Sequence, residues 1–251
     1  MTTAPDNESI EATFAFVDLA GFTAMTEAHG DAEAFSIVRT FRDRASQALG
    51  PGDELVKMIG DAAMLRFTTP EGAIQALRQL LQRELVVQDA VLLPRAGAHH
   101  GRALAVDGDY YGAAVNLAAR IAGQAHGGQL LATEQTALAA RDLGAIVTHV
   151  GAVSLRNISE SIDVYDIQVG EDIEPAVTDP VCQMRVPATG DSAIALDWSG
   201  RRFNFCGLPC LSRFAADPDR YLDRTTTSTQ SRSSTNRTEG SGAADRQRPP
   251  S

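Results

Sequence analysis

The sequence predicts a mixed α/β (α+β) sandwich, with helices mainly on one face of a largely antiparallel sheet. Residues 13–169 alternate between apolar runs with strand character and stretches whose apolar residues recur at helical spacing. The dipeptide Gly60-Asp61 separates two short apolar runs, which is a hairpin signal. With 43% hydrophobic and 22% charged residues, the 251-residue chain has the composition of a folded globular protein.

The first elements follow from these patterns. Residues 13–20 form an apolar run with β-branched and aromatic side chains and predict a strand. Residues 23–49 predict one or two helices, and Pro51-Gly52-Asp53 ends them. Strands over 54–59 and 62–67 then flank the hairpin tip. The helical stretch places these residues on its apolar face: Met25, Ala28, Ala32, Phe35, Val38, Phe41, Ala45 and Leu49.

The remaining elements of this region follow the same logic. Residues 70–86 suit a helix because Pro70 stands in its first turn. A second helix is expected over 112–125. Strands over 95–106, 130–132, 145–155 and 164–169 complete the sheet.

The last third of the chain divides into three parts. Residues 170–178 are acidic, contain Pro175 and predict a linker. Residues 179–222, called the C-terminal unit below, are few for an independent core, so a metal or packing on the first domain should support them. Residues 223–251 contain no Ile, Leu, Val, Met or aromatic residue and predict a disordered tail.

Charge and composition restrict the partners. The net charge of −10 offers no basic footprint for a nucleic acid polymer. No apolar run is long enough to span a membrane and the first residues lack a signal-peptide pattern, so we expect a cytoplasmic protein that does not bind membranes. Three cysteines without an export signal favour reduced thiols over a disulfide framework.

Two carboxylates give the clearest chemical signal. Asp18 ends the first apolar strand, and Asp61 stands at the hairpin tip. Two such carboxylates brought together can hold Mg²⁺ on the phosphates of a nucleotide. Five further polar residues have spacings that folding alone does not explain: Lys57, Arg95, Asp109, Asn116 and Arg120.

Four motifs carry a family resemblance. F-V-D-L-A-G-F-T, K-M-I-G-D, R-A-G-A-H-H-G and G-D-Y-Y-G-A-A-V-N-L-A-A-R-I occur in this order. Residues 11–169 therefore resemble the catalytic domain of class III adenylate/guanylate cyclases, which implies a ferredoxin-like core. Each motif alone is weak, but the four in register form a strong signal.

The resemblance implies a role for each matching position around the phosphates. Asp18 and Asp61 would hold two divalent cations, Mg²⁺ or Mn²⁺, for attack of the ribose 3′-oxygen on the α-phosphorus with loss of pyrophosphate. Arg95 would bind the triphosphate, for which a guanidinium fork is suited. Further triphosphate contacts are expected from backbone N–H groups of Leu19, Gly21, Phe22 and Thr23 and from Arg156, which stands where the family usually has lysine.

The resemblance also implies how the base and ribose are held. Lys57 and Asp109 match the pair that reads adenine, since Lys offers donors and an ionised Asp offers acceptors, so ATP is favoured over GTP. Asn116 and Arg120 share one helix face and would orient the ribose and stabilise the transferring phosphate. In this family the metal aspartates and the Asn/Arg helix come from different subunits, which implies a head-to-tail homodimer.

The C-terminal unit resembles the YHS domain, although Gln183 replaces a common glycine and Arg-Phe-Asn only weakly matches the Tyr-His-Ser signature. Cys182, Cys206 and Cys210 could bind Zn²⁺ or another soft metal, or could be small buried residues of a treble-clef-like fold. No fourth ligand is evident in the unit. His29, His126 and His149 give no signal, and the adjacent His99 and His100 are expected to be structural.

We therefore expect an adenylate cyclase that makes 3′,5′-cyclic AMP and pyrophosphate from ATP, with a small module that modulates it. A catalytically inactive nucleotide- or metal-binding regulator and a guanylate cyclase are the alternatives. The complete set of catalytic residue types argues against the first, and the Lys57/Asp109 pair argues against the second.

Overall fold

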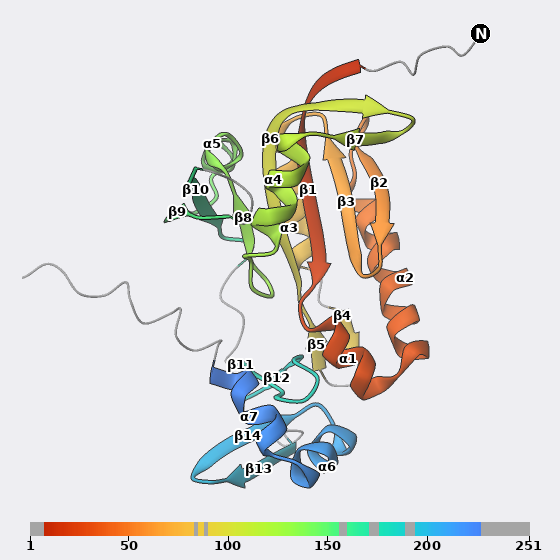
Figure 1. Cartoon of the computed structure of the whole chain (residues 1–251), viewed down its shortest axis with the longest axis vertical. Coiled ribbons are helices and arrows are strands. Elements are labelled where there is room, and N and C mark those ends of the chain that lie inside the picture. The colour runs from red at the N-terminus through yellow and green to blue at the C-terminus, as the bar shows by residue number, and fades with distance from the viewer. Residues whose placement is uncertain are drawn as a thin grey trace, which may run out of the picture.

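The fold is described from a computed structural model over residues 8–82, 85–87, 90–155, 160–170, 176–188 and 194–226 (Figure 1). Strands and helices alternate along the first two thirds of the chain, as predicted. In chain order these elements are β1 (Glu8–Leu19), α1 (Phe22–His29), α2 (Asp31–Ala48), β2 (Glu54–Ile59), β3 (Ala62–Phe67), α3 (Pro70–Gln82), β4 (Leu85–Val87), β5 (Ala90–Leu92), β6 (Pro94–Val106), β7 (Asp109–Tyr111), α4 (Ala113–Ala122), β8 (Leu130–Ala132), α5 (Glu134–Asp142), β9 (Val147–Val153) and β10 (Ile162–Ile167).

The main sheet runs in the order β2-β3-β1-β6-β8-β10-β9, with β7 also paired to β6. Its paired strands are antiparallel, except that β6 and β8 run parallel. The long central pair, β1 and β6, is in register from Glu8 opposite Ala105 to Leu19 opposite Pro94. The predicted, largely antiparallel sheet is therefore present.

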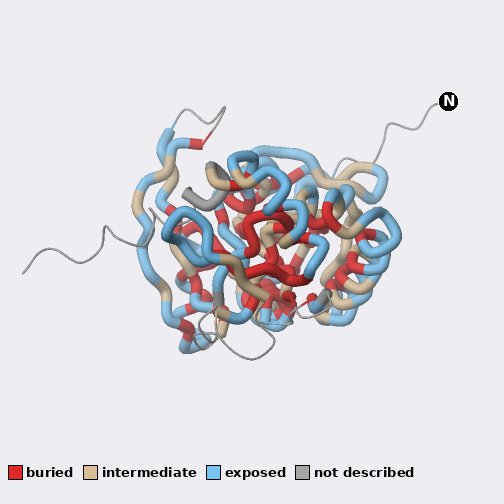
Figure 2. Tube along the Cα trace, turned by 90° about the horizontal axis from the view of Figure 1, so that it is seen from below, coloured by how far each residue is buried: buried red, intermediate tan, exposed pale blue. Residues whose placement is uncertain are grey.

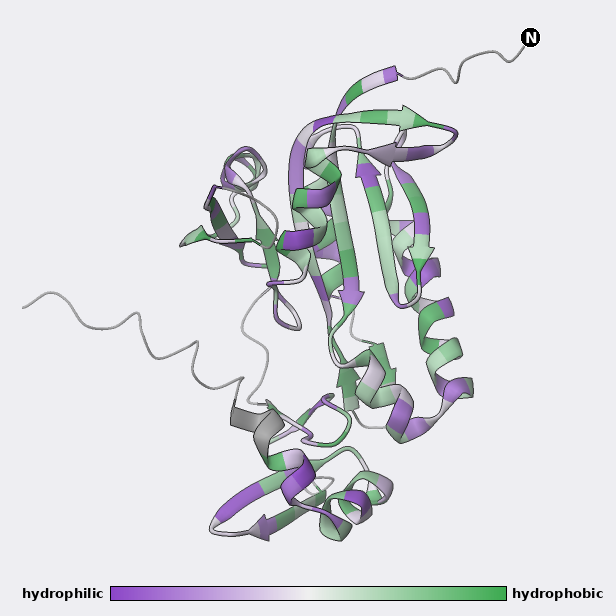
Figure 3. Ribbon diagram, in the orientation of Figure 1, coloured by the Kyte–Doolittle hydropathy of each residue, from purple (hydrophilic) through white to green (hydrophobic). Residues whose placement is uncertain are grey.

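Side chains of β1 divide between two cores because successive strand residues point to opposite faces. Ala15, Val17 and Leu19 enter the large core, which also contains residues of α1, α2, α3 and α5. Ala12 and Phe14 enter a smaller core beneath α4. Helices thus cover mainly one face, and α4 lies alone among them on the other (Figure 1). The apolar colouring of β1 and β3 in Figure 3 reflects burial on both sides.

Two predicted helices differ from the observed ones. A turn at Gly30, with φ of 91°, separates α1 from α2 and changes the helical phase. Ala34 and Ile37 are therefore buried, whereas Phe35, which the continuous spacing assigned to the apolar face, is 69% exposed. The helix predicted over 70–86 ends at Gln82, and β4 and β5 follow as a hairpin. Strand β7 and helix α5 were also not predicted.

The C-terminal unit contains β12 (Arg185–Pro187), β13 (Ile194–Trp198), β14 (Arg201–Phe205), α6 (Leu208–Ala216) and α7 (Asp219–Thr226). Within the predicted linker, β11 (Ala176–Thr178) pairs with β12, and β12 in turn pairs with β5, so a second sheet runs β11-β12-β5-β4. Residues 171–175 lie outside the described residues. The unit is thus joined to the first domain by strand pairing as well as by the chain.

Apolar residues of the C-terminal unit belong to the same core as those of the first domain. Phe214 is fully buried and its ring contacts those of Phe203 and Phe205. Figure 2, from below, shows buried residues gathered inside a shell of exposed ones. Packing on the first domain therefore supports this small unit. Order continues beyond the predicted end at Leu222, because α7 extends to Thr226, while residues 227–251 lie outside the described residues.

None of the helices in the described ranges combines the length and the apolar character that a membrane crossing requires. The cytoplasmic location remains a prediction.

Gly97 on β6 should be essential for the packing of α4. A Cβ added there would lie 2.0 Å from the backbone nitrogen of Ala122, which belongs to α4 and cannot move without the helix. We predict that Gly97→Ala lowers the free energy of unfolding by about 1–3 kcal/mol, as overpacked cores do. Urea denaturation measures this change.

Gly123→Ala is the matched control. Its added Cβ would meet the carbonyl oxygens of Arg120 and Ala119 at the ordinary contact distances of 3.5 and 3.8 Å, and its φ of −65° suits any residue. Equal unfolding free energies for the two variants would contradict the close approach of α4 to β6.

Candidate active site

The end of β1 brings Asp18 opposite Arg95 on β6. The guanidinium of Arg95 holds both carboxylate oxygens: Nε donates to Oδ1, and Nη2 donates to Oδ2 at 3.1 Å. Nη1 donates to the carbonyl oxygen of Ala125 at 3.0 Å. Arg95 therefore fixes the orientation of Asp18 and retains donor capacity for a further anion.

The β2–β3 hairpin brings Asp61 to the same place. Gly60, with φ of 64°, supplies the left-handed conformation of this tight turn. Burial raises the pKa of Asp61 above its ordinary value, and the nearby Asp18 carboxylate raises it further, while hydrogen bonds from the backbone N–H groups of Asp61 and Leu19 lower it. Two oxygen-donor carboxylates in such close electrostatic contact suit a hard divalent cation, which relieves their repulsion.

A β-bulge puts Lys57 on the α4 face of the sheet, which also carries Asp18. Leu55 is paired with Leu65, but Lys57 is paired with Met64, so Val56 is an extra residue in the ladder. Leu65 belongs to the large core and Met64 to the core beneath α4. The bulge therefore switches Lys57 to the α4 face, where regular alternation would have left it on the other side.

Lys57 meets Asp109 from the start of β7. The two side chains form an ion pair of 2.5 Å between Nζ and Oδ2, and both remain partly exposed, at 40% and 24%. The hydrogen bond from Lys57 lowers the pKa of Asp109. Each side chain can still form further hydrogen bonds, since an ammonium group has three donors and a carboxylate has about four acceptor sites.

Asn116 and Arg120 lie on the exposed side of α4, one helical turn apart, as their spacing predicted. The opposite side of α4 is buried on the sheet through Ala114 and Ala118. Neither polar side chain takes part in the contact between Asp18 and Arg95 or in that between Lys57 and Asp109. A single chain thus brings the two predicted metal aspartates near each other and pairs the two predicted base residues, but leaves Asn116 and Arg120 exposed on α4.

The loop before α1 has the form expected of a phosphate-binding turn. Gly21 is the N-cap of α1 with φ of 81°, and neither a capping side chain nor an acidic residue occupies the first turn. Backbone N–H groups of Phe22 and Thr23 begin the helix, where the helix dipole favours anions. Leu19 is buried, whereas Thr23 is exposed. Arg156 lies outside the described residues, so its predicted role is a proposal only.

His99 and His100 point to different partners, in keeping with their adjacent places on β6. Nδ1 of His99 lies 2.8 Å from Oγ1 of Thr133, and Nδ1 of His100 lies 2.9 Å from Oγ1 of Thr13. Burial lowers the pKa of His99 to about 4, so it is neutral at pH 7. Both histidines thus tie β6 to its neighbours.

A second group of polar residues lies where α1 meets the C-terminal unit. Cys182, Cys206 and Cys210 are buried free thiols, and His29 joins them from α1. Hydrogen bonds from Cys182 and Cys206 lower the pKa of the Cys210 thiol. No sequence pattern pointed to His29, because it lies more than 150 residues from the nearest cysteine and only the folded chain brings it there.

Residues 5–168 match the family described as Adenylate and Guanylate cyclase catalytic domain. The chain belongs to this family. The match covers the main sheet with its helices and includes every active-site residue predicted from the sequence, and it ends before the C-terminal unit.

Two curated proteins are similar in sequence to this cyclase domain. An uncharacterized protein of Mycobacterium tuberculosis is 38% identical over 128 residues, which are 51% of this chain and 34% of that protein. A protein named adenylate cyclase from Glutamicibacter nicotianae is 29% identical over 158 residues, or 62% of this chain and 39% of that protein. The chain thus spans well under half the length of these curated relatives.

Solved cyclase structures share the fold. The adenylyl cyclase CyaB from P. aeruginosa superposes with a TM-score of 0.55 at 20% identity, covering 64% of this chain and 95% of that one. An adenylate/guanylate cyclase/hydrolase from Silicibacter pomeroyi gives 0.57 at 22% identity, covering 65% and 99%. The C-terminal unit adds to this common fold, and its resemblance to the YHS domain remains a prediction.

The raised pKa of Asp61 predicts a stability cost of the ionised site. Because the folded pKa lies above the unfolded value of 3.8, stability is lost as the pH rises through the folded pKa. We predict that Asp61→Asn raises the melting temperature at pH 7 in the presence of a chelator, and that this gain shrinks as the pH falls through the folded pKa and disappears below 3.8. Added Mg²⁺ should stabilise the parent more than the variant.

Thermal melts between pH 3 and 8, with and without Mg²⁺, measure these differences. Glu160→Gln, an exposed carboxylate outside the site, is the control. A variant less stable than the parent at pH 7 in chelator would show that the site does not strain Asp61.

Proposed function

We propose that this chain is an adenylate cyclase that converts ATP to 3′,5′-cyclic AMP and pyrophosphate at a site shared by two copies of the chain. Two observations carry the proposal: Lys57, in its ion pair with Asp109, lies on the same face of the sheet as Asp18, and Asp61 lies close enough to Asp18 for the two carboxylates to interact. Membership of the cyclase family supports the reaction class, and relatives named adenylate cyclase support the substrate.

Asp18 and Asp61 are proposed to hold two divalent cations, Mg²⁺ or Mn²⁺, since their oxygens and their mutual repulsion suit hard cations. Bound cations would make the ribose 3′-hydroxyl more acidic and neutralise triphosphate charge. Arg95 would keep Asp18 in place and direct its remaining N–H groups at the triphosphate. Leu19, Gly21, Phe22 and Thr23 would present backbone N–H groups to the phosphates.

Lys57 and Asp109 are proposed to select adenine. Lys57 would donate to adenine N1 and Asp109 would accept from the exocyclic amine, while their ion pair keeps both side chains in position. Guanine presents a carbonyl and an N–H in the same places, so each contact would be mismatched. The pair therefore supports ATP over GTP.

Asn116 and Arg120 are proposed to act on the nucleotide held by a partner copy. Both are exposed on α4, and neither contributes to the Asp18–Arg95 contact of its own chain. Leu104 and Tyr111, paired across β6 and β7, are exposed apolar residues on the same arm of the sheet and offer contact area for that partner. A head-to-tail homodimer would bring each α4 to the other chain's aspartates.

The domain limits are likewise proposed: a catalytic domain over 11–169, a linker over 170–178, a YHS-like module over 179–222 and a tail over 223–251. Pairing of β11 with β12 would make part of this linker an ordered strand.

The shared site predicts complementation between two inactive variants. Asp61→Asn lacks a metal ligand and Arg120→Ala lacks a phosphate-stabilising cation, so each alone should lose at least about 100-fold in kcat. Random pairing leaves one intact site in half of the dimers, so co-refolded variants should regain about a quarter of the parental activity. Cyclic AMP formation from ATP with Mn²⁺ or Mg²⁺ measures this.

Each variant refolded alone is the control, and sedimentation shows whether dimers form. A dimeric but inactive mixture would refute the exchange of residues between subunits. A dimeric parent that makes no cyclic nucleotide from ATP or GTP would instead favour a regulator that binds without turnover.

The base-reading pair predicts an exchange of specificity. Lys57→Glu with Asp109→Cys should shift the ratio of kcat/KM for ATP and GTP by at least about tenfold toward GTP, because the hydrogen-bonding pattern is reversed. Steady-state kinetics with both nucleotides measure the ratio.

Tyr110→Phe, at the residue that follows Asp109, is the matched control. It removes only the hydrogen bond from the Tyr110 hydroxyl to Glu54 and keeps the ring against Phe14. An active double variant with unchanged ATP preference would show that other residues read the base.

A further inference from the structure

Four side chains with metal-binding atoms meet at the junction of α1 and the C-terminal unit. His29, Cys182, Cys206 and Cys210 each offer one such atom, and all of these atoms lie within 4.8 Å of one another. Sγ of Cys206 lies 3.6 Å from Sγ of Cys182 and 3.5 Å from Sγ of Cys210. Nε2 of His29 lies 3.5 Å from Sγ of Cys206 and 3.9 Å from Sγ of Cys210.

These four separations are close to the edges of a tetrahedral coordination shell. With zinc–sulfur bonds of about 2.3 Å and zinc–nitrogen bonds of about 2.0 Å, tetrahedral geometry gives edges of about 3.8 Å between sulfurs and about 3.5 Å between sulfur and nitrogen. The four measured edges agree within a few tenths of an ångström. A disulfide requires sulfurs about 2.05 Å apart, so the thiols are arranged as ligands rather than as a crosslink.

The surrounding structure holds the three cysteines in this arrangement. The fully buried carboxylate of Asp179 accepts hydrogen bonds from the backbone N–H of Cys182 at 3.3 Å and of Cys206 at 2.8 Å. Cys210 follows Cys206 by four residues and lies in the first turn of α6. One buried side chain thus fixes two ligand-bearing segments, while the helix fixes the third.

His29 reaches the cysteines from the other domain. It is the last residue of α1, and Gly30 turns the chain sharply behind it. The side chain is only partly buried, so neither burial in the core nor a role in the predicted active site accounts for its place beside two thiols.

We propose that His29, Cys182, Cys206 and Cys210 form a tetrahedral Zn²⁺ site that fastens α1 of the cyclase domain to the C-terminal unit. Three thiolates and one imidazole form a closed donor set for zinc, and such four-ligand sites are structural rather than catalytic. The site completes the three-cysteine set of the C-terminal unit with a ligand that only the first domain supplies.

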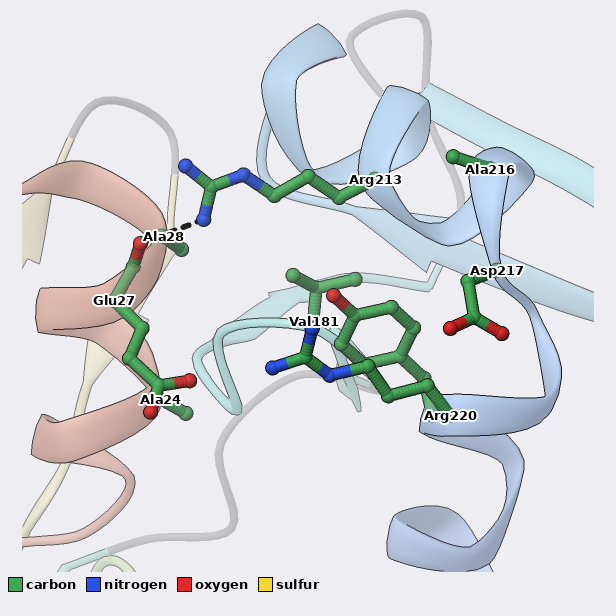
Figure 4. A pocket seen from close by; sticks show the side chains of 9 residues that line it. Ala24, Glu27, Ala28, Val181, Arg213, Ala216, Asp217 and Arg220 are labelled. Atoms are coloured by element: carbon green, nitrogen blue, oxygen red, sulfur yellow. Dashed lines mark hydrogen bonds between the residues drawn. The ribbon is translucent and has the colours of Figure 1, made fainter.

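The C-terminal unit also contacts α1 and the residue before it at other points. A Cβ on Gly21 would lie 2.7 Å from Cβ of Gln183, the residue after Cys182. Nη1 of Arg213 donates to the carbonyl oxygen of Glu27 at 2.6 Å. A cavity of about 470 Å³ lies between α1 and helices α6 and α7, and Figure 4 shows Arg213 reaching across it. The zinc site would therefore close one end of an interface whose other end touches the loop at Gly21.

Metal binding by the full reduced chain tests the site. After chelation, the chain is titrated with Zn²⁺ against a competing chromophoric chelator, and with Co²⁺ for its absorption spectrum. We expect one Zn²⁺ per chain and a Co²⁺ spectrum with intense tetrahedral and thiolate charge-transfer bands. His29→Gln should weaken binding by at least about tenfold and alter the Co²⁺ spectrum, whereas Cys206→Ser should abolish tight binding.

His126→Gln is the matched control, because His126 is exposed and outside the cluster. It should bind Zn²⁺ as the parent does. The proposal would be overturned if His29→Gln kept the parental Zn²⁺ affinity and Co²⁺ spectrum. It would also be overturned if the reduced chain bound less than one Zn²⁺, or if freshly purified protein contained a Cys182–Cys206 disulfide.

Hydrogen exchange tests the fastening of α1. Removal of Zn²⁺ from the parent should increase amide exchange across residues 22–29, and Zn²⁺ should not restore protection in His29→Gln. Unchanged exchange in a parent chain that binds and releases Zn²⁺ would refute the fastening. Neither measurement requires nucleotide or turnover, so the result is independent of the proposed cyclase activity.

Discussion

Antiparallel pairing of β1 with β6 fixes where the other parts of the site lie. The register puts Asp18 opposite Arg95, so that the guanidinium of Arg95 holds the carboxylate at the end of the strand in position. It also puts Phe16 opposite Gly97, and the missing side chain at Gly97 lets α4 approach the sheet. A slip of one residue would turn Asp18 to the large core, because strand side chains alternate between faces.

Three local backbone features then position the other charged residues of the candidate site. The Gly60 turn brings Asp61 beside Asp18, the bulge at Val56 turns Lys57 to the α4 face, and β7 brings Asp109 to Lys57. The result concentrates opposite charges in partly exposed positions, where a nucleotide can reach them. Burial and the nearby Asp18 carboxylate destabilise the ionised form of Asp61 and so raise its pKa. This is expected of a residue whose position serves binding rather than stability.

The C-terminal unit is more closely integrated with the cyclase domain than a linked module would be. It extends a sheet through β5, shares the large core and contacts α1 at both ends. Because α1 starts directly after the Asp18–Gly21 loop, any change at the thiol cluster would act on an element that belongs to the candidate active site. A hydrophobic core continuous across the boundary makes such coupling physically direct.

The sequence by itself determined the cyclase family, the order of most strands and helices, and the residue types of the site, since motifs such as K-M-I-G-D combine a strand, a turn and a charged residue locally. It assigned Phe35 to the core wrongly, because Gly30 resets the helical phase. Tertiary structure alone decided that β5 pairs with β12, that a bulge directs Lys57 and that His29 meets three cysteines. These features depend on contacts between residues far apart in the chain. The spacing of apolar residues could not predict them, because it reports only on the local environment of residues that are close in sequence.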